Sequence, residues 1–463
     1  MPSTDRWQRL RLPYCADASV SFSSIRDLPG AILLDSGSGT ADAGRFDIMA
    51  AAPDPDRSVR LSPSPDVSEV AQFFDRLDGI HRDAASSHER GGEDLPFCGG
   101  LIGYLGYDAG MPMHGMCIPQ ADSSKTALPA AQVGYYRWAI VQDHLLRRSF
   151  LVAEAGVSDV ELNDILQRVT TAQDAYTPFE LLSGFSSNLA PEDYASAFRR
   201  VKDYIHAGDC YQVNLAQCFS APYRGDPFSA YRSLRPLAAA AFAGYVDVDD
   251  HSALLCLSPE RFIDLHGRNV STQPIKGTRP RSKDPVRDRE IARELQDSSK
   301  DLAENLMIVD LLRNDLGRNC EPGSIRVESL FELRSYPSVH HLVSTIAGRL
   351  QNERTAIDLL RDSFPGGSVT GAPKRRAMQI IAELEPDSRQ AYCGSLFYLC
   401  NSGRMDSNIM IRSLVALNDT MLCWAGGGLV ADSDCNAEYQ ETIDKVGAFL
   451  KSLEASGLRH APQ

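Results

Sequence analysis

Two segments far apart in the sequence place acidic residues in the same pattern. Asp301-Leu-Ala-Glu304 and Glu438-Tyr-Gln-Glu441 each put two carboxylates three positions apart at the start of a segment with helical periodicity. Residues i and i+3 are neighbours on the surface of an α-helix, so each helix would present a pair of acids. Either pair alone could simply belong to an acidic helix face that is exposed to solvent. If the two helices face each other, their four carboxylates would suit Mg²⁺, which prefers oxygen ligands.

Two glycine-rich runs accompany these helices. Pro365–Lys374 leads into a predicted helix but lacks the Gly-Lys-Ser/Thr ending of a P-loop, and Ala425–Gly428 precedes the helix with Glu438 and Glu441. Either run could be a simple turn. Backbone N–H groups at the start of a helix also favour an anion. A cation that binds one carboxylate and amides that hold another would together form a site for a small dicarboxylate.

Composition restricts the class of protein. The chain has 463 residues, 43% of them hydrophobic, and a net charge of −14 at pH 7. It can bury a large core, and its acidity argues against non-specific binding to nucleic acid. The 11 cysteines are scattered without a CxxC pair, which is typical of reduced thiols in the cytoplasm. Since the start is too polar for a secretory signal and no apolar run approaches the roughly 20 residues of a membrane helix, we expect a soluble cytoplasmic enzyme with no membrane partner.

Local patterns predict interleaved strands and helices. The expected strands are Ala31–Leu34, Phe46–Ala50, Gly134–Val141, Cys210–Phe219, Ala253–Asp264, Val270–Ile275 and Ser407–Leu417. The expected helices are Pro191–Gly208, Asp297–Leu316, Pro373–Leu384 and Asp434–Leu453, with a loop at Pro53–Asp66 and a connector at Ala172–Ala190. Glycine- and proline-rich joins favour antiparallel pairing, so we expect an α+β fold rather than a doubly wound sheet.

Beyond these patterns, the sequence resembles the chorismate-utilising enzymes over almost its whole length. The matching segments are Leu33–Ser36, Arg45–Ile48, Gly99–Asp108, Gly208–Gln217, Ser258–Phe262, Pro274–Thr278, Ala303–Leu311, Arg313–Asp315, His340–Ser344, Phe364–Lys374, Ile409–Arg412 and Ala425–Lys445. The resemblance implies two packed antiparallel β-sheets flanked by helices. It also implies an N-terminal region, residues 1–180, that is intertwined with a chorismate-binding catalytic region, residues 187–455.

The resemblance assigns roles to the acidic pairs. Glu304 and Glu441 match direct Mg²⁺ ligands of the family, and Asp301 and Glu438 match ligands that act through water. The metal would hold the ring carboxylate of chorismate, acting as a Lewis acid and a template.

The same family assigns the substrate-binding residues. Arg412 matches the arginine that binds the enolpyruvyl carboxylate, for which a guanidinium is well shaped. The residues expected to complete the pocket are Tyr392, Gly426, Gly427, Gly428 and Lys445, with Thr278 and His341 along the ring. Because His340 and His341 are adjacent on a predicted strand, at most one of them can face the substrate. Without the family, either histidine would be assigned to the core or the surface.

Two positions distinguish members of the family. Gln212 falls where the isochorismate and salicylate synthases carry a lysine that activates water. Glutamine cannot accept a proton at neutral pH, so Gln212 argues for ammonia as the nucleophile. Lys276 falls where anthranilate synthase component I typically has alanine, and where members that aminate carbon 4 have lysine. A partly buried lysine can lose its proton and act as a nucleophile.

These assignments imply a mechanism. Lys276 adds to carbon 2 of chorismate while Glu260, as general acid, protonates the departing 4-hydroxyl. Ammonia then attacks carbon 4 and expels Lys276, which gives 4-amino-4-deoxychorismate for 4-aminobenzoate and folate synthesis. Lys276 could instead be an electrostatic anchor for the dianionic substrate. Apart from its motif, Glu260 would be taken for a surface acid at the end of a strand.

The expected partner is a separate glutamine amidotransferase subunit that supplies ammonia, because the sequence shows no residues of its own for glutamine hydrolysis. Relatives that bind tryptophan carry an Asn-Pro-x-Pro-Tyr/Phe segment, which Arg235–Phe242 lacks. Ser36 is therefore favoured as a turn residue, with a tryptophan pocket around Asp35 and Ser36 as the alternative. Two other functions stay open: anthranilate synthase component I, which aminates carbon 2, and a non-catalytic subunit that binds chorismate or tryptophan.

Overall fold

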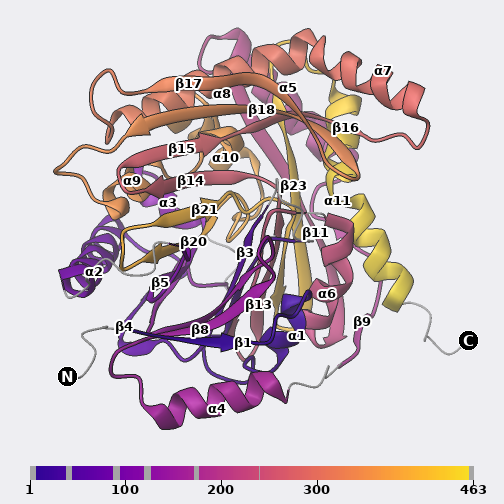
Figure 1. Cartoon of the computed structure of the whole chain (residues 1–463). Coiled ribbons are helices and arrows are strands. Elements are labelled where there is room, and N and C mark those ends of the chain that lie inside the picture. Colours follow the sequence, from indigo (N-terminus) through magenta and orange to yellow (C-terminus); the bar gives the residue numbers. More distant parts are fainter. Residues whose placement is uncertain are drawn as a thin grey trace, which may run out of the picture.

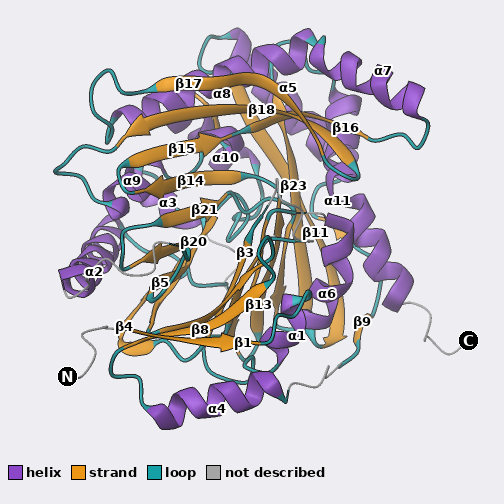
Figure 2. Cartoon of the chain, in the orientation of Figure 1, coloured by secondary structure: helices purple, strands orange, loops and turns teal. Residues whose placement is uncertain are grey.

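Two antiparallel β-sheets with helices on their outer sides form the molecule (Figure 1, Figure 2). The computed structural model describes residues 7–37, 44–86, 94–118, 127–171, 177–238 and 240–457. The arrangement confirms the predicted α+β class. Within the described ranges, no helix is both long and apolar enough to cross a membrane.

The larger sheet contains the strands that carry Gln212 and the glycines of Ala425–Gly428. Its strands, in spatial order, are β1 (Trp7–Leu12), β8 (Arg148–Glu154), β7 (Trp138–Asp143), β3 (Phe46–Ala50), β2 (Ile32–Asp35), β12 (Phe242–Asp249), β13 (Ser252–Ser258), β22 (Ser413–Leu417), β23 (Thr420–Leu429), β11 (Gln212–Gly225) and β10 (Ser186–Ser187). Two short strands, β9 (Phe179–Leu181) and β19 (Gly371–Ala372), also pair with β11.

The smaller sheet contains the strands with Lys276 and His341. Its order is β16 (Ile275–Pro280), β18 (Val339–Arg349), β15 (Asn269–Gln273), β14 (Arg261–His266), β21 (Met405–Asn408), β20 (Ser395–Cys400), β5 (Gly100–Leu105), β6 (Ala131–Tyr136) and β4 (Asp54–Leu61), and β17 (Arg326–Ser335) pairs with β18. In both sheets, strands from the first 180 residues pair with strands from the second half of the chain.

The helices begin where local chemistry favours them. Pro191 occupies the first turn of its helix, and the Ser298 side chain accepts a hydrogen bond from the Asp301 N–H as an N-cap. The described helices are α1 (Ala18–Ser23), α2 (Val67–Ser86), α3 (Tyr107–Met113), α4 (Asp159–Thr170), α5 (Pro191–His206), α6 (Pro227–Ala238), α7 (Pro285–Gln296), α8 (Ser299–Gly317), α9 (Ala356–Ser363), α10 (Lys374–Leu384) and α11 (Cys435–Gly457), with a 3₁₀ turn, η1 (Gly367–Val369).

The apolar core is layered around the sheets. One cluster fills the space between the two sheets and includes apolar residues of α2, α8 and α9. A second cluster lies under α1, α4, α6 and α11 on the outer side of the larger sheet. In Figure 2, α4 runs along the bottom of the molecule while α7 and α8 lie along the top. The two long acidic helices, α8 and α11, are therefore held by different sheets.

Three segments predicted as single strands are each divided between the two sheets. Gly134–Val141 becomes β6 and β7, Ala253–Asp264 becomes β13 and β14, and Ser407–Leu417 becomes β21 and β22. The apolar character continues through each segment, since both halves are buried, so the pattern gave no sign of the change of sheet.

At two of these places, which we call crossovers, the chain passes from one sheet to the other. The two crossovers lie side by side and carry predicted site residues. Glu260 lies between β13 and β14, and Arg412 lies between β21 and β22. The Ile409 N–H donates to the Glu260 carbonyl at 3.1 Å, and the Leu257 N–H donates to the Arg412 carbonyl at 3.2 Å. The backbone thus fixes the acid and the guanidinium relative to each other at the junction of the sheets.

The predicted loop Pro53–Asp66 was wrong in part, because β4 occupies Asp54–Leu61 and pairs with β6. As the last strand of its sheet it has one paired side only, which allows a proline and several charged residues. The connector Ala172–Ala190 contains β9 and β10, and residues 172–176 lie outside the described residues.

Candidate functional site

A cavity of about 770 Å³ lies where the two crossovers meet β16, β18, β23, α8 and α11. Most of the predicted site residues line it: Glu260, Lys276, Thr278, Asp301, Glu304, His341, Tyr392, Arg412, Gly426, Gly428, Glu438, Glu441 and Lys445. The sequence places these residues on eight separate segments, so their convergence is the main result of the fold for function.

The two acidic helices present all four predicted carboxylates to this cavity. Lys300 Nζ lies 2.9 Å from Glu438 Oε1, Lys445 Nζ lies 2.8 Å from Glu441 Oε1, and an Arg279 nitrogen lies 2.8 Å from Asp301 Oδ2. Three of the acids are thus paired with cationic side chains. The oxygen donors are of the type that Mg²⁺ prefers. In this arrangement, however, no three described Asp, Glu, His or Cys side chains form a metal-binding cluster.

The charges of the acids differ with their surroundings. Burial raises the pKa of the Glu304 carboxyl, and this effect outweighs the opposing charges of Lys276 and Lys300. Burial acts in the same direction on Glu441, but Lys445, together with Lys300 and Lys276, outweighs it, so the pKa of that carboxyl is lowered. Glu304 is therefore the acid with the least compensation, and a cation beside it would relieve the cost of its burial.

Arg412 supplies a partly buried positive charge to the cavity. Burial lowers the pKa of its guanidinium. Nearby, the rings of Tyr392 and Trp424 stack with their centroids 6.5 Å apart, and burial raises the pKa of the Tyr392 phenol, which stays protonated. A fork of N–H donors beside two aromatic faces can bind a carboxylate attached to an unsaturated group.

The two neighbouring histidines point to different surroundings, as their positions on a strand require. His341 lines the cavity, and its Nδ1 lies 2.8 Å from the Thr278 hydroxyl. Burial, with the charge of Arg412, lowers the pKa of His341 to about 3, so its imidazole is neutral at physiological pH. His340 contacts Ser335 and Asp288 instead. Only one of the pair, His341, therefore faces the cavity.

Lys276 and Glu260 meet at one residue of η1. Lys276 Nζ donates to the Ser368 carbonyl at 2.7 Å, and the Ser368 hydroxyl donates to Glu260 Oε1 at 2.6 Å. Glu260 is 4% exposed, and burial raises the pKa of its carboxyl despite the nearby charge of Lys276. An amine and a carboxyl that favours its protonated form thus stand together at the cavity wall.

The glycines of the second run lie in a strand rather than at the start of a helix. Gly426, Gly427 and Gly428 belong to β23 and pair with Ala216, Leu215 and Asn214 of β11. A Cβ added to Gly427 would lie 3.2 Å from Glu438 Oε2, and one added to Gly428 would lie 2.0 Å from Gln212 Nε2. The prediction of a helix N-terminus was therefore wrong, because glycine is needed here for close packing. β22 pairs with β23 only up to Cys423, so the glycines of β23 lie beyond the end of that pairing.

Gln212 does not line the cavity. Its buried side chain lies behind Gly428, and its Oε1 has no hydrogen-bond partner among the described residues. Gly427 is likewise absent from the lining, while its neighbours are present. Gln212 thus supports the cavity wall from behind, while Gly427 faces the side chains of Glu438 and Glu441.

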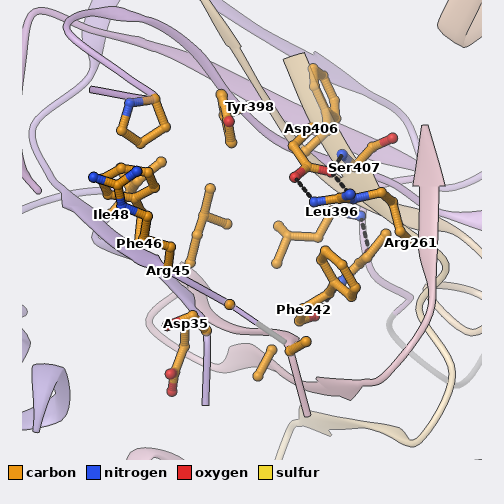
Figure 3. Close-up of a pocket in the computed structure, with 18 of the residues that line it drawn as sticks. Asp35, Arg45, Phe46, Ile48, Phe242, Arg261, Leu396, Tyr398, Asp406 and Ser407 are labelled. Carbon is orange, nitrogen blue, oxygen red and sulfur yellow. Dashed lines mark hydrogen bonds and ion pairs between the residues drawn. The ribbon is translucent and has the colours of Figure 1, made fainter. Parts of the chain in front are cut away.

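Ser36 belongs to a second, smaller cavity between the sheets (Figure 3). This cavity, of about 270 Å³, is lined by Asp35, Phe46, Phe242, Arg261 and Asp406, among others. Ser36 directly follows β2, is buried, and donates its hydroxyl to Asp47 Oδ1 at 2.7 Å. Ser36 is thus a buried, hydrogen-bonded residue at a place separate from the cavity with Lys276.

Several residues of the larger cavity were not predicted, among them Asn214, Lys300, Ser368 and Trp424. Asn214 Oδ1 is buried without a hydrogen-bond partner in the described part of the chain. The available signal for Asn214 was a polar residue between the apolar Val213 and Leu215. For Lys300 it was the position next to Asp301. Ser368 could only be found once the fold had brought η1 to Glu260.

The comparisons with known proteins agree with the fold. The family model of chorismate binding enzymes matches residues 32–451. The chain belongs to this family.

Among its relatives, aminodeoxychorismate synthase component 1 of Salmonella typhimurium is 44% identical over 453 residues, which cover 96% of this chain and 98% of that protein. The protein of the same name from Escherichia coli is 44% identical over 94% and 96% of the two chains. Anthranilate synthase component I from Streptococcus pneumoniae has a solved structure that superposes with a TM-score of 0.75 at 31% identity, over 88% of this chain and 92% of that one. The chain therefore spans nearly the full length of its relatives.

Proposed function

We propose that the protein catalyses the amination of chorismate by ammonia at carbon 4, which yields 4-amino-4-deoxychorismate for 4-aminobenzoate and folate synthesis in the cytoplasm. The observation that carries this proposal is the placement of Lys276 and Glu260 on either side of Ser368 in the cavity. The names of relatives at 44% identity support it.

The chemistry assigned to these residues proceeds in two substitutions. Lys276, in its neutral form, adds to carbon 2, both conjugated ring double bonds shift toward carbon 4, and the 4-hydroxyl takes a proton from Glu260 and leaves as water. Ammonia then adds to carbon 4, the two double bonds shift back, and Lys276 leaves as the free amine. The ammonium group formed at carbon 4 returns a proton to the Glu260 carboxylate. The enolpyruvyl ether is unchanged throughout. Burial of Glu260 serves the first step, because it favours the protonated carboxyl.

The substrate would be oriented by groups at both ends of the cavity. Arg412 would pair with the enolpyruvyl carboxylate, while neutral His341 and Thr278 would line the ring without adding charge. Asp301, Glu304, Glu438 and Glu441 fit Mg²⁺ by donor type, and Lys300 and Lys445 would have to release their partners when it binds. When bound, Mg²⁺ would supply charge neutralisation for the ring carboxylate.

Ammonia would come from a separate glutamine amidotransferase subunit. The relatives' designation as component 1 supports a second component. Ammonium salts at high concentration and high pH should replace that subunit, because the fraction of free ammonia rises with pH.

A product assay tests the function. The purified chain is incubated with chorismate, Mg²⁺ and an ammonium salt, and the products are separated by chromatography. We expect 4-amino-4-deoxychorismate. Anthranilate would instead assign the reaction to carbon 2, as in the Streptomyces coelicolor anthranilate synthase component 1, which is 38% identical over 77% of this chain. Unchanged chorismate, together with saturable chorismate binding, would indicate a binding subunit.

A further inference from the structure

We propose that Ser368 is a positioning residue that holds Lys276 and Glu260 in their working orientations, one through its backbone carbonyl and the other through its hydroxyl. This inference rests on the proposed roles of Lys276 and Glu260. It concerns the residue between them, which would act through both of them rather than through the substrate.

The 3₁₀ turn that carries Ser368 is held on several sides. The Val369 carbonyl accepts from an Arg389 nitrogen at 3.0 Å, and the Thr370 carbonyl accepts from the Asn214 N–H at 2.9 Å. A Cβ added to Gly367 would lie 2.7 Å from a Leu311 carbon on α8, so the turn packs directly on that helix. Ser368 itself is 6% exposed. Its two oxygens are therefore fixed points in the cavity wall.

The backbone carbonyl of Ser368 orients the lysine. A neutral amine has two N–H donors and one lone pair. Because one N–H of Lys276 is bound to the Ser368 carbonyl at 2.7 Å, the remaining directions of Nζ, including the lone pair, are available to the cavity. This contact uses the backbone, so a side-chain substitution at position 368 preserves it.

The hydroxyl of Ser368 orients the acid. It donates to Glu260 Oε1 at 2.6 Å, which leaves Oε2 as the oxygen that carries the transferable proton. The same bond stabilises the ionised carboxylate and so acts against burial. The charged groups that also act on Glu260 are Lys276 and, from α11, Lys445, and the Cys393 thiol is a titratable neighbour.

The test is the variant Ser368→Ala, assayed as chorismate consumption with ammonium across a range of pH. We expect kcat to fall about 10- to 100-fold, the usual effect of losing a hydrogen bond to a charged group, with KM for chorismate nearly unchanged. The alkaline limb of the kcat profile should move to higher pH, because the Glu260 carboxyl loses a donor that favoured its ionised form. Ser368→Cys, with a weaker donor, should give a smaller change of the same sign.

Ser363→Ala is the matched control. Ser363 is 1% exposed, ends α9 close to the same glycine-rich run, and its hydroxyl has no hydrogen-bond partner among the described residues. The pH profile of kcat for Ser363→Ala should match that of the wild type. An unchanged profile in Ser368→Ala, or a loss of activity with a fixed alkaline limb and a raised KM, would overturn the inference.

A second measurement separates this inference from the proposed function. Infrared titration of the protonated carboxyl band, compared between wild type and Ser368→Ala, follows the ionisation of Glu260 without turnover. An upward shift of its midpoint in the variant supports the role of Ser368 whichever product the enzyme forms. An unmoved midpoint refutes that role even if 4-amino-4-deoxychorismate is produced.

Discussion

At the scale of the residue, side chains of the same type take different roles in the site because their surroundings differ. Lys276, Lys300 and Lys445 all line one cavity, yet Lys300 and Lys445 are paired with acids of α11 while Lys276 contacts a backbone carbonyl. The amines of Lys300 and Lys445 are engaged by carboxylates, whereas the amine of Lys276 is bound to a neutral carbonyl and is open to the cavity. This contrast favours Lys276 as the nucleophile.

Replacement of Lys276 separates a covalent role from an anchoring role. Lys276→Ala should lower kcat at least about 100-fold, and Lys276→Arg should be nearly as inactive, because a guanidinium keeps the charge but is not a nucleophile. Mass spectrometry of the wild-type protein with chorismate but no ammonia should detect an adduct equal to chorismate less water. Substantial activity in Lys276→Arg would favour an electrostatic anchor. Lys451→Ala, at an exposed position of α11, is the control.

The raised pKa of Glu260 predicts how kcat depends on pH. Burial raises the pKa of its carboxyl, so the acid form persists above the usual range for glutamate and is lost as the pH rises through that raised pKa. At a constant concentration of free ammonia, kcat should therefore fall on the alkaline side. Glu260→Gln should lower kcat about 100- to 10,000-fold and remove that limb, as expected on loss of a general acid. A variant that kept the alkaline limb would assign it to a different group.

At the scale of the element, the sequence predicted the helices better than the strands. The helix at Pro191–Gly208 is confirmed as α5 because its cap and its apolar period are local signals. The changes of sheet at Arg137, at Pro259–Glu260 and at residues 409–412 were missed, because a strand that enters a second buried sheet keeps the same composition. The motifs located Glu260 and Arg412, but only the crossovers explain why the two are close.

The facing helices α8 and α11 give a prediction about metal binding. Glu304→Gln and Glu441→Gln should each weaken Mn²⁺ binding, measured by electron paramagnetic resonance in place of Mg²⁺, by at least about tenfold, because each removes a hard anionic oxygen. Asp310→Asn is the control, since Asp310 lies on α8 with its side chain 80% exposed. Equal Mn²⁺ affinity in all of the variants would exclude these two glutamates as ligands.

At the scale of the whole molecule, a buried acid links stability to pH. Asp108 at the start of α3 is 4% exposed, and burial raises its pKa to about 7 although the Gln390 N–H donates to it. In the unfolded chain the same carboxyl ionises near its usual pKa of about 4. Its folded state therefore holds the proton more tightly, and the free energy of unfolding falls as the pH rises from about 4 to 7.

Asp108→Asn should remove this part of the pH dependence. At pH 8 we expect the variant to be more stable than the wild type by up to a few kcal/mol, with the difference shrinking toward pH 5. Thermal unfolding of both proteins across this range measures the effect. A wild-type advantage at pH 8 would mean that the carboxylate is stabilised in the fold.

The pairing of β5 with β20 has a consequence for how the protein is made. During synthesis, the strand Gly100–Leu105 cannot pair with Ser395–Cys400 until the ribosome has made the later segment. At ribosomal speeds of about 5–20 residues per second, that delay is roughly 15 to 60 s. During this interval the nascent chain exposes apolar strand edges in the crowded cell, so its yield should depend on chaperones far more than the stability of the finished enzyme would suggest.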